Sequence, residues 1–347
     1  MEYSFNMSGR QLSIEVNKFA KQANGSVLVR YGDTVLLVTA TASKEPREGI
    51  DFFPLTVDYE ERMYSVGKIP GGFIKREGRP TEKAILAARL TDRPLRPLFP
   101  KGFRNAVHIV STVMSMDQDN PPEIASINGA SLALSISDIP FAGPVAAVMV
   151  GYVDGQLVVN PDIEQRDKSD LQLTVAGTRD AIMMVESGAN EINKDVFIDA
   201  LLLAHQEIKA LVAFQEEIVR EIGKPKMEVH ISAVPEEMEE EVREFAVHSL
   251  TDALCIPDKL AREGRIDEIL AAWLEKFEET PEDLGHAKEA FNNLLKKLVR
   301  SRILDLDIRP DGRKHNEIRP ISCEVGILPR IHGSALFTRG QTQVLNA

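Results

Sequence analysis

A short repeat near the two ends of the chain limits the possible folds more than any other feature of the sequence. The stretch GSVLVRYGDTVLL, which starts at Gly25, matches GSALFTRGQTQVL, which starts at Gly333, at six of thirteen positions without a gap. The matching residues are Gly25, Ser26, Leu28, Gly32, Thr34 and Leu37 with Gly333, Ser334, Leu336, Gly340, Thr342 and Leu345. Each copy is typical of two β-rich runs around a turn. Such similarity over a long interval indicates an internal duplication.

The second copy of the repeat begins near Arg309 and stops at Ala347, after its first predicted hairpin. Upstream of the hairpin, SGRQLSIEV in the first copy corresponds loosely to DGRKHNEIRPISCEV in the second. An isolated hairpin cannot bury enough surface to form a domain. We therefore expect residues 306–347 to be the truncated start of a second domain of the first type; an independent terminal extension is the alternative.

Predicted strands and helices are mixed along residues 1–225. Further strand candidates are DFFPLTVDYE, AVHIVSTVMSM and the hairpins GPVAAVMVGYVDGQLVVN and DLQLTVAGTRDAIMMVESGA, the first hairpin turning at Asp154-Gly155. Helix candidates are RPTEKAILAARLTD, PPEIASINGASLALSISD and a long amphipathic segment closed by Gly223. Pro94 is expected to end or kink the first of these helices. The pattern favours an α+β domain over 1–225.

The strand signal disappears after the linker candidate GKPKMEVHIS. From Pro235 to about Arg302, three segments with helical periodicity each start at or near a proline. We expect a small all-helical domain over 226–305. Its acidic run, Glu236 to Glu241, is interpreted as a solvated helix start favoured by the helix dipole, with an acidic patch for a partner as the alternative.

Charge is distributed unevenly along the chain. The formal net charge is -12, which argues against general nucleic-acid binding by the whole surface. Between Arg62 and Arg104, however, eleven basic residues face only three acidic ones. No apolar run is long enough to span a bilayer, and the N-terminus lacks the pattern of a secretory signal. The only cysteines, Cys255 and Cys323, are far apart, which fits a reducing compartment and predicts neither a disulfide framework nor a zinc knuckle.

The basic segment PGGFIKREGRPTEKAILAARLTDRPLRPLFP contains the candidate binding residues. Its glycines predict a loop that exposes Phe73 beside Lys75, Arg76 and Arg79. An aromatic ring that stacks on a base, next to cations that meet phosphates, suits single-stranded nucleic acid. In the following helix Arg89, Arg93 and Arg96 recur at spacings of four and three, so one face presents all three guanidinium groups. The alternatives are a pocket for a small phosphorylated metabolite and internal ion pairs with carboxylates such as Asp92 and Glu82.

Catalytic motifs are missing from the sequence. GKIPGG is not followed by the GK[ST] of a phosphate-binding P-loop, and the histidines form no HExxH or HxH motif. His205 and Ser131 are interpreted as packing residues within helices. Asp58, Glu60 and Glu61 could form a carboxylate cluster, but strand-end charge beside Arg62 explains them as well. We therefore assign no catalytic residue and no metal ligand.

The chain resembles the polynucleotide phosphorylase family, whose members contain two RNase PH-like cores. The resemblance spans nearly the whole chain and is carried by GSVLVRYGDTVLLVTA, DFFPLTVDYEER, GKIPGGFIKREGRPTEKAILAARLTDRPLRPLFP, GYVDGQLVVNP, LTVAGTRDAIMMVESGA and LPRIHGSALFTRGQTQVL. It implies a first RNase PH-like core over 1–225, a helical linker domain over 226–305 and the start of a second core over 306–347.

The resemblance also implies an activity, the processive 3′-to-5′ phosphorolysis of RNA. Inorganic phosphate is the expected co-substrate, Mg²⁺ the expected cofactor, and nucleoside diphosphates the products. Members form ring-shaped homotrimers around single-stranded RNA, so we expect a homotrimer in the cytoplasm that acts in mRNA degradation, with partners from RNA-degradation complexes and no membrane attachment. A non-catalytic RNA-binding ring scaffold of the exosome type is the alternative.

The resemblance assigns roles to residues of the basic segment. The family's FFRR loop lines the RNA channel and reads FIKR here, so Ile74 replaces an aromatic residue and Lys75 an arginine. The expected RNA-binding residues are Phe73, Lys75, Arg76, Arg79, Arg89, Arg93, Arg96 and, from RPDGR, Arg313. The family's phosphate-binding serines and metal-binding aspartates are expected beyond Ala347. This piece alone is therefore expected to bind RNA poorly and to be inactive.

Overall fold

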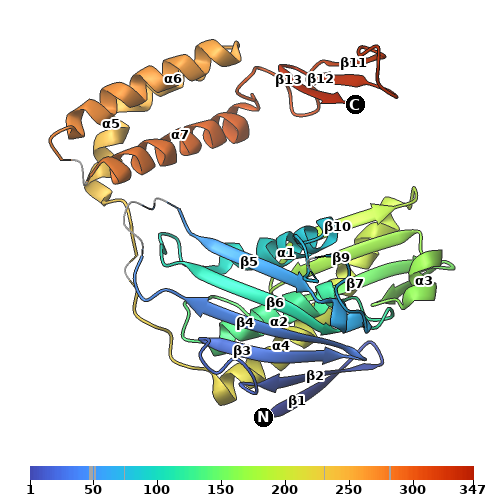
Figure 1. The fold of residues 1–347 in the computed structure, drawn as a ribbon. Coiled ribbons are helices and arrows are strands. Elements are labelled where there is room, and N and C mark those ends of the chain that lie inside the picture. The colour runs from blue at the N-terminus through green and yellow to red at the C-terminus, as the bar shows by residue number, and fades with distance from the viewer. Residues whose placement is uncertain (47–49, 51, 74, 230, 281–282) are drawn as a thin grey trace. The chain divides into compact units, whose positions relative to one another are not determined.

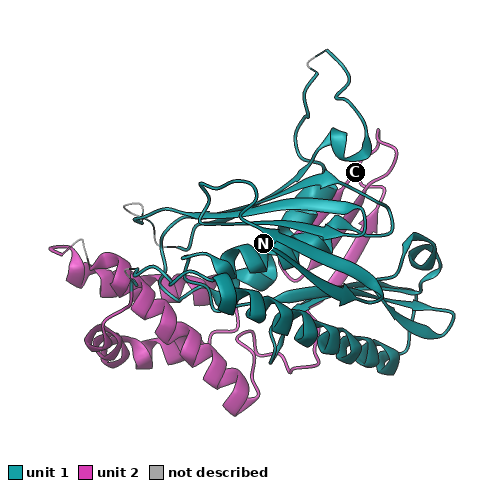
Figure 2. Cartoon of the chain, turned by 90° about the horizontal axis from the view of Figure 1, so that it is seen from below, with its two compact units in different colours: residues 1–232 teal, residues 233–347 magenta. Residues whose placement is uncertain are grey.

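The computed structural model describes residues 1–46, 50, 52–73, 75–229, 231–280 and 283–347. The chain forms two compact units, Met1–Ser232 and Ala233–Ala347, each with its own hydrophobic core (Figures 1 and 2). The predicted three-part division, with boundaries at residues 225 and 305, stays a prediction. Among the described residues no helix combines the length and apolar composition needed to cross a membrane.

The first unit contains a six-stranded sheet with the order β1-β2-β3-β4-β6-β5 (Figure 1). Its strands are β1 (Glu2–Met7), β2 (Arg10–Val16), β3 (Gly25–Tyr31), β4 (Thr34–Ala42), β5 (Leu55–Glu61) and β6 (Val107–Ser115). Neighbouring strands are antiparallel, except for β5 and β6, which run parallel. The order places β5 at one edge of the sheet, where the basic segment begins.

A second sheet of the first unit has the order β10-β9-β7-β8. It consists of β7 (Ala146–Val153), β8 (Gln156–Val159), β9 (Leu171–Gly177) and β10 (Ile182–Ala189), and the short helix α3 (Ile163–Lys168) lies between β8 and β9 in the chain. Both predicted hairpins are confirmed. Asp154 and Gly155 have φ values of 49° and 80°, as a tight hairpin turn with two left-handed residues requires.

Three long helices complete the first unit. Helix α2 (Pro122–Ile136) packs against β3, β4 and β7 and is buried from Ile124 to its end, so it forms the centre of the core. A Cβ atom at Gly129 would lie 2.8 Å from Val38 Cγ2, so only a small residue allows this close approach. Helix α1 (Glu82–Leu95) packs on β5, and α4 (Lys194–Ile222) packs on β7 and β9.

The predicted helix ends are confirmed with one change of conformation. The α-helical part of α1 ends directly after Pro94 and continues as the short 3-10 helix η2 (Arg96–Leu98). Gly223 caps α4, but its φ of -63° is extended rather than left-handed. Glycine is still required there, because a Cβ atom would lie 2.4 Å from the Val219 carbonyl oxygen.

The second unit begins with the predicted helices. These are α5 (Glu236–Ala253), α6 (Lys259–Leu274) and α7 (Leu284–Leu306), with the 3-10 helix η3 (Glu275–Phe277) after α6. The only tryptophan, Trp273, is fully buried among them and donates a 2.9 Å hydrogen bond from Nε1 to the Ala287 carbonyl. Glu236 and Glu237 are exposed in the first turn of α5, in agreement with a solvated helix start, whereas Glu239 of the same run is half-buried and pairs with Lys297 on α7 at 3.1 Å.

The second copy of the repeat forms a three-stranded antiparallel sheet in the second unit. Its strands are β11 (Ile321–Val325), β12 (Ala335–Arg339) and β13 (Thr342–Asn346). The pairing of Arg339 with Thr342 reproduces that of Tyr31 with Thr34 in the first copy. The glycines of the two turns, Gly32 and Gly340, have φ values of 59° and 61°. The predicted duplicated hairpin is therefore confirmed.

Candidate nucleic-acid interface

The loop between β5 and α1 contains the glycine-rich front of the basic segment, and its base is held by side-chain contacts. Arg62 forms ion pairs with Glu60 on β5 and with Glu77 at the far end of the loop, the second at 3.6 Å. Next to this pair, the Thr81 hydroxyl donates a 2.8 Å hydrogen bond to Glu61 and accepts one from the Ala84 amide, which caps α1. Figure 2 shows a loop that projects from the first unit. The contacts fix where the loop leaves and rejoins the unit.

The tip of this loop presents an aromatic ring and two cations to solvent. Phe73 is fully exposed, and Lys75 and Arg76 are exposed beside it. Ile74 lies outside the described residues. Gly72 and Lys75 both have a left-handed backbone, with φ values of 75° and 50°, and each of them turns the chain at the tip. Neither cation forms an ion pair within the described part of the chain, so both are available to an anionic ligand.

The arginines of α1 and η2 differ in how firmly they are held. Arg96 forms a two-pronged ion pair with Asp92 and donates hydrogen bonds to the carbonyls of Phe53 and Leu55. Arg93 is paired with Glu186 on β10. Arg89 is exposed and forms no ion pair in the described ranges. Of the three arginines that the spacing places on one face, Arg89 has an open guanidinium, Arg93 is paired with the second sheet and Arg96 is fixed against β5.

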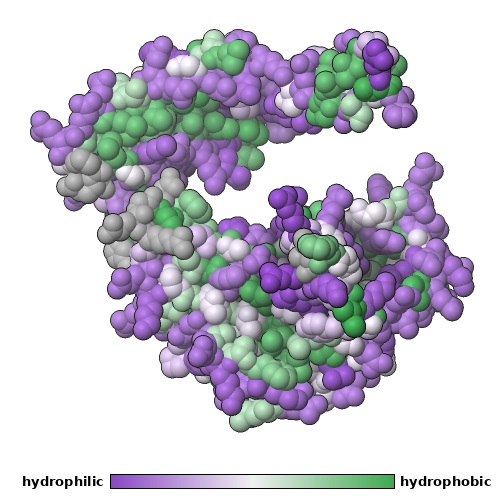
Figure 3. Space-filling view, in the orientation of Figure 1, coloured by the Kyte–Doolittle hydropathy of each residue, from purple (hydrophilic) through white to green (hydrophobic). Residues whose placement is uncertain are grey.

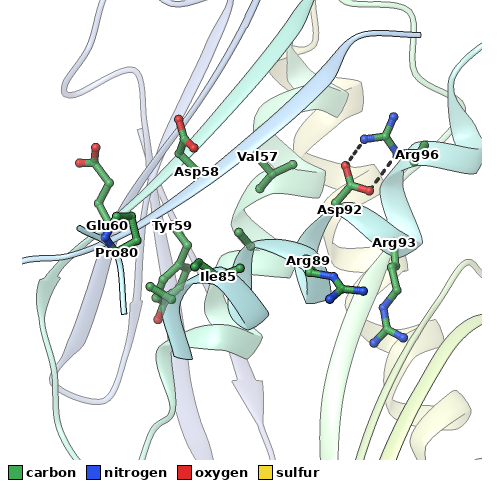
Figure 4. A pocket seen from close by; sticks show the side chains of 12 residues that line it. Val57, Asp58, Tyr59, Glu60, Pro80, Ile85, Arg89, Asp92, Arg93 and Arg96 are labelled. Carbon is green, nitrogen blue, oxygen red and sulfur yellow. Dashed lines mark hydrogen bonds and ion pairs between the residues drawn. The ribbon is translucent and has the colours of Figure 1, made fainter. Parts of the chain in front are cut away.

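A cavity of about 770 Å³ lies between β5 and α1 (Figure 4). The three arginines border it on the helix side, and Arg96 is folded onto Asp92 there. Val57, Ile85 and Ala88 contribute an apolar lining. Asp58 and Glu60 also border the cavity, but their carboxylates point away from the arginines in Figure 4. The helix side therefore offers one open guanidinium to an anion, that of Arg89.

Arg79 and Arg313 complete the predicted set. Arg79 is exposed where the loop approaches α1 and has no ion pair in the described chain. Arg313 belongs to the second unit; its side chain is 15% exposed, bonds to Asp311 at 2.9 Å and donates to the Glu317 carbonyl. Burial would raise the pKa of Asp311, but the hydrogen bonds from Arg313 outweigh it and lower that pKa. Arg313 thus serves mainly to order its own turn.

The carboxylates proposed as a possible cluster are directed to different partners. Asp58 bonds to His108 at 2.7 Å, Glu60 pairs with Arg62, and Glu61 accepts the Thr81 hydroxyl. No group of three or more His, Cys, Asp or Glu side chains among the described residues is placed to hold a metal ion. The interpretation as charge at the end of a strand is the one that these contacts support.

The two residues interpreted as packing residues have structural partners. Ser131 donates to Gln215 and accepts the Val145 amide, all inside the core. His205 is half-buried on α4, with Nε2 3.2 Å from the Thr178 carbonyl. Both interpretations are confirmed.

Two features of the site were missed in the sequence. The Arg62–Glu77 pair at the base of the loop was not predicted, although opposite charges on either side of a glycine-rich stretch could have suggested it. Tyr59 was not singled out at all: it is 3% exposed, and its hydroxyl has no hydrogen-bonding partner in the described chain. An alternating strand pattern predicts a buried ring here, but no sequence signal predicts an unpartnered hydroxyl.

Comparison with protein families agrees with this architecture. Residues 8–140 match domain 1 of the 3′ exoribonuclease family, and residues 143–207 match its domain 2. Residues 237–314, which include the helices of the second unit, match the RNA binding domain of polyribonucleotide nucleotidyltransferase.

Curated relatives extend the match to nearly the whole chain. This chain is 61% identical over 345 residues to the polyribonucleotide nucleotidyltransferase of Heliobacterium modesticaldum. The match covers 99% of this chain and 49% of the relative. The enzymes of that name from Syntrophomonas wolfei and Geobacillus kaustophilus are 58% and 57% identical, each over 99% of this chain. The chain spans about half the length of these relatives. With an RNase PH-type fold, a duplicated hairpin and this identity, the chain belongs to the polyribonucleotide nucleotidyltransferase family.

Proposed function

We propose that this chain supplies the RNA-binding part of a phosphorolytic 3′-to-5′ exoribonuclease. In the proposed reaction an oxygen of inorganic phosphate attacks the phosphorus of the last phosphodiester bond of the RNA. The bond from that phosphorus to the 3′ oxygen of the preceding nucleotide breaks, and the 3′ oxygen takes up a proton. The terminal nucleotide leaves as a nucleoside 5′-diphosphate, and the reverse reaction lengthens the RNA.

The observation that carries this proposal is the exposed tip of the loop between β5 and α1. Phe73 offers both faces of its ring to solvent, and stacking of one base on an aromatic ring contributes about 1–3 kcal/mol. Lys75 and Arg76 flank it without internal ion pairs in the described chain and can meet consecutive phosphates. Because rings and phosphates occur in every nucleotide, this arrangement favours single-stranded RNA without selecting a sequence.

The remaining residues of the proposed site have graded roles. Arg79 and Arg89 are open cations that can extend the phosphate path from the loop to α1. Arg93 can exchange Glu186 for a phosphate, since that ion pair is exposed and weak. Arg96 acts as a positioning residue that holds α1 against β5. Arg313, on the second unit, can contact RNA by exchanging its bonds to Asp311 and the Glu317 carbonyl for a phosphate.

The chemical step is not assigned to residues of this chain. The described residues contain no constellation suited to a metal ion, so no step is derived through Mg²⁺, and the predicted Mg²⁺ dependence stays a prediction. We further propose a ring-shaped homotrimer, a cytoplasmic location, a role in mRNA degradation and partners in RNA-degradation complexes. A non-catalytic ring scaffold would use the same loop to bind RNA without turnover.

RNA binding is tested by titrating a fluorescent poly(A) oligonucleotide with the chain over a series of salt concentrations. Arg76→Glu with Arg79→Glu should weaken binding at least tenfold. It should also reduce the slope of log affinity against log salt by about 1.4, because each lost phosphate contact on a single strand removes about 0.7. Lys194→Glu with Lys209→Glu on α4 is the matched control, since it reverses two exposed charges away from the loop. An unchanged salt slope in the double variant would contradict the assignment.

Turnover is tested by measuring phosphate-dependent release of ADP from poly(A), with this chain and the Heliobacterium relative side by side. We expect release by the relative, and weak RNA binding with little or no release by this chain. If the relative binds poly(A) but releases no ADP when phosphate is present, the scaffold alternative replaces the proposed reaction.

A further inference from the structure

The near end of the loop between β5 and α1 is fixed to the sheet. It forms the 3-10 helix η1 (Met63–Val66), in which the Ser65 carbonyl accepts a 3.1 Å hydrogen bond from the Met116 amide, directly after β6. Between Ile69 and Arg76, by contrast, the residues that the structure describes form no hydrogen bond with the rest of the unit. The position of the tip therefore depends on how the two ends of the loop are held.

Glu77 joins the far end of the loop to the near end. Its carboxylate forms an ion pair with Arg62 at 3.6 Å and accepts a 3.3 Å hydrogen bond from the Met63 amide. The side chains of Arg62 and Glu77 are only 34% and 33% exposed, so solvent screens their attraction less than that of a fully exposed pair. Arg62 also pairs with Glu60 on β5, which extends the connection to the sheet.

We propose that Glu77 is a positioning residue for RNA, which holds the tip in the arrangement that binds the strand. This role rests on the proposed function of the loop. A Cβ atom at Gly71 or Gly72 would have no neighbour within 4 Å, so packing does not limit the backbone of the tip there. Restricting such a chain on binding costs conformational entropy. A link between the ends of the loop removes part of that cost before the RNA arrives.

The charge of Glu77 and its position predict opposite effects on RNA affinity. Glu77 directly follows Arg76, so its carboxylate lies close in the chain to a cation proposed to meet phosphate. If Glu77 acted through its charge alone, its removal would strengthen RNA binding, because like charges repel. If it holds the tip, its removal weakens RNA binding, because a smaller fraction of the loop is in the binding arrangement.

The link itself is tested without RNA, by the rate at which trypsin cleaves after Lys68. This residue is exposed, and its amide donates a 3.0 Å hydrogen bond to the Met63 carbonyl, so cleavage requires local opening of the loop. Glu77→Ala should accelerate cleavage at least threefold. Glu77→Gln should have an intermediate rate, since it keeps an acceptor for the Met63 amide. Glu82→Ala is the matched control and should keep the wild-type rate.

Glu82 suits this comparison because it removes the same charge from the same segment. It is exposed in the first turn of α1 and forms no ion pair in the described part of the chain. Circular dichroism confirms that each variant is folded. If Glu77→Ala is not, Glu77→Gln takes its place in every comparison, with smaller changes in the same direction.

The effect on RNA is measured with a fluorescent poly(A) oligonucleotide over a series of salt concentrations. Glu77→Ala should lower the affinity at least threefold, whereas Glu82→Ala should not lower it. A threefold loss corresponds to about 0.7 kcal/mol, which is within the range of a partly exposed ion pair. Arg62→Ala should also lower the affinity, and the double variant should lose no more than the weaker single variant, since both changes break one link. The salt slope should stay unchanged in Arg62→Ala, whereas loss of a direct phosphate contact would reduce it by about 0.7.

The outcomes separate this proposal from the proposed function. Unchanged or higher RNA affinity in Glu77→Ala, an equal loss in Glu82→Ala, or a wild-type cleavage rate in Glu77→Ala overturns the positioning role. If the wild-type chain does not bind poly(A) while Glu77→Ala is cleaved faster, the RNA-binding function is overturned and Glu77 remains a structural link of the loop.

Discussion

The two copies of the repeat share a local structure and differ in burial. In the first copy, β3 and β4 lie under α2, and residues such as Val29 and Leu36 are completely buried. In the second copy, the equivalent Phe337 and Val344 are 38% and 48% exposed. Figure 3 shows hydrophobic side chains at the surface of this part of the second unit. Strand pairing and the turn therefore form without a covering helix, whereas a buried core does not.

The largest expected difference concerns side-chain truncation at equivalent buried and exposed positions. Leu36→Ala should destabilise the first unit by about 2–5 kcal/mol, because it leaves a cavity beneath α2. Val344→Ala should change stability by less than about 0.5 kcal/mol. Hydrogen exchange of β3–β4 and β12–β13 amides reports on each copy separately. Equal effects in the two copies would break the comparison.

The next difference concerns the glycines that open the two hairpins. A Cβ atom at Gly25 would lie 2.1 Å from the backbone carbonyl oxygen of Ala133 on α2, whereas the equivalent Gly333 has open space around it. Gly25→Ala should therefore cost about 1–3 kcal/mol, since a backbone atom must move. Gly333→Ala should be neutral within about 0.5 kcal/mol. Urea denaturation followed by circular dichroism measures the first variant, and exchange of the β12–β13 amides measures the second.

A smaller difference is expected at the two turn glycines. Both have a left-handed backbone, so alanine costs each about 1–2 kcal/mol of backbone strain. At Gly32 a Cβ atom would also lie 2.3 Å from the Asn120 side-chain amide, whereas at Gly340 the nearest atom is 3.2 Å away on flexible Arg319. Gly32→Ala should thus lower the free energy of unfolding slightly more than Gly340→Ala. Exchange of the flanking amides measures both, and a larger loss at Gly340 would contradict the expected order.

The smallest expected effect concerns pH and the helix that covers the first copy. Lys226 is an exposed residue, but its ammonium group donates hydrogen bonds to the carbonyls of Leu134, Ser135 and Ser137 at the end of α2. Desolvation lowers the pKa of Lys226 to about 8 from an ordinary value of 10.5, and the charge of Asp138 opposes part of this shift. Between pH 8 and 10.5 the unfolded chain therefore binds more protons than the folded chain.

It follows that the free energy of unfolding should rise with pH across this window. Below pH 8 the charged Lys226 ammonium group lowers the free energy of unfolding by its full amount. This penalty disappears as the pH approaches 10.5. Lys226→Met should remove this part of the pH dependence, while Lys209→Met on the exposed face of α4 should keep it. Urea denaturation at pH 7.5, 9 and 10.5 compares the slopes. A wild-type slope that persists in Lys226→Met would show that another group is responsible.

Much of the first unit could be predicted because its signals are local. Three features each depend on residues within one or two turns of chain: the Asp154-Gly155 turn, the Thr81 cap of α1 and the end of that helix one residue after Pro94. The exposed tip at Phe73 was predictable for the same reason, since glycines and a proline exclude regular structure there. The duplicated hairpin followed from matching residues, and its pairing agrees with them.

The site itself was predictable only as a set of candidates. The spacing of Arg89, Arg93 and Arg96 places them on one face, but it does not reveal which guanidinium is already occupied. Arg93 meets Glu186 on another sheet, and Arg96 meets the carbonyls of Phe53, just before β5, and of Leu55, its first residue. These partners are distant in sequence, so no local pattern contains them.

The amino-acid order alone determined where strands, turns and the cationic loop occur, because backbone preferences and alternation act over a few residues. Tertiary structure decided which copy of the repeat is buried, which arginines stay open and that the buried Tyr59 hydroxyl has no hydrogen-bonding partner in the described chain. Those properties depend on what packs against each residue. Contacts between distant segments, such as α2 over β3 and β4, arise only when the whole unit folds.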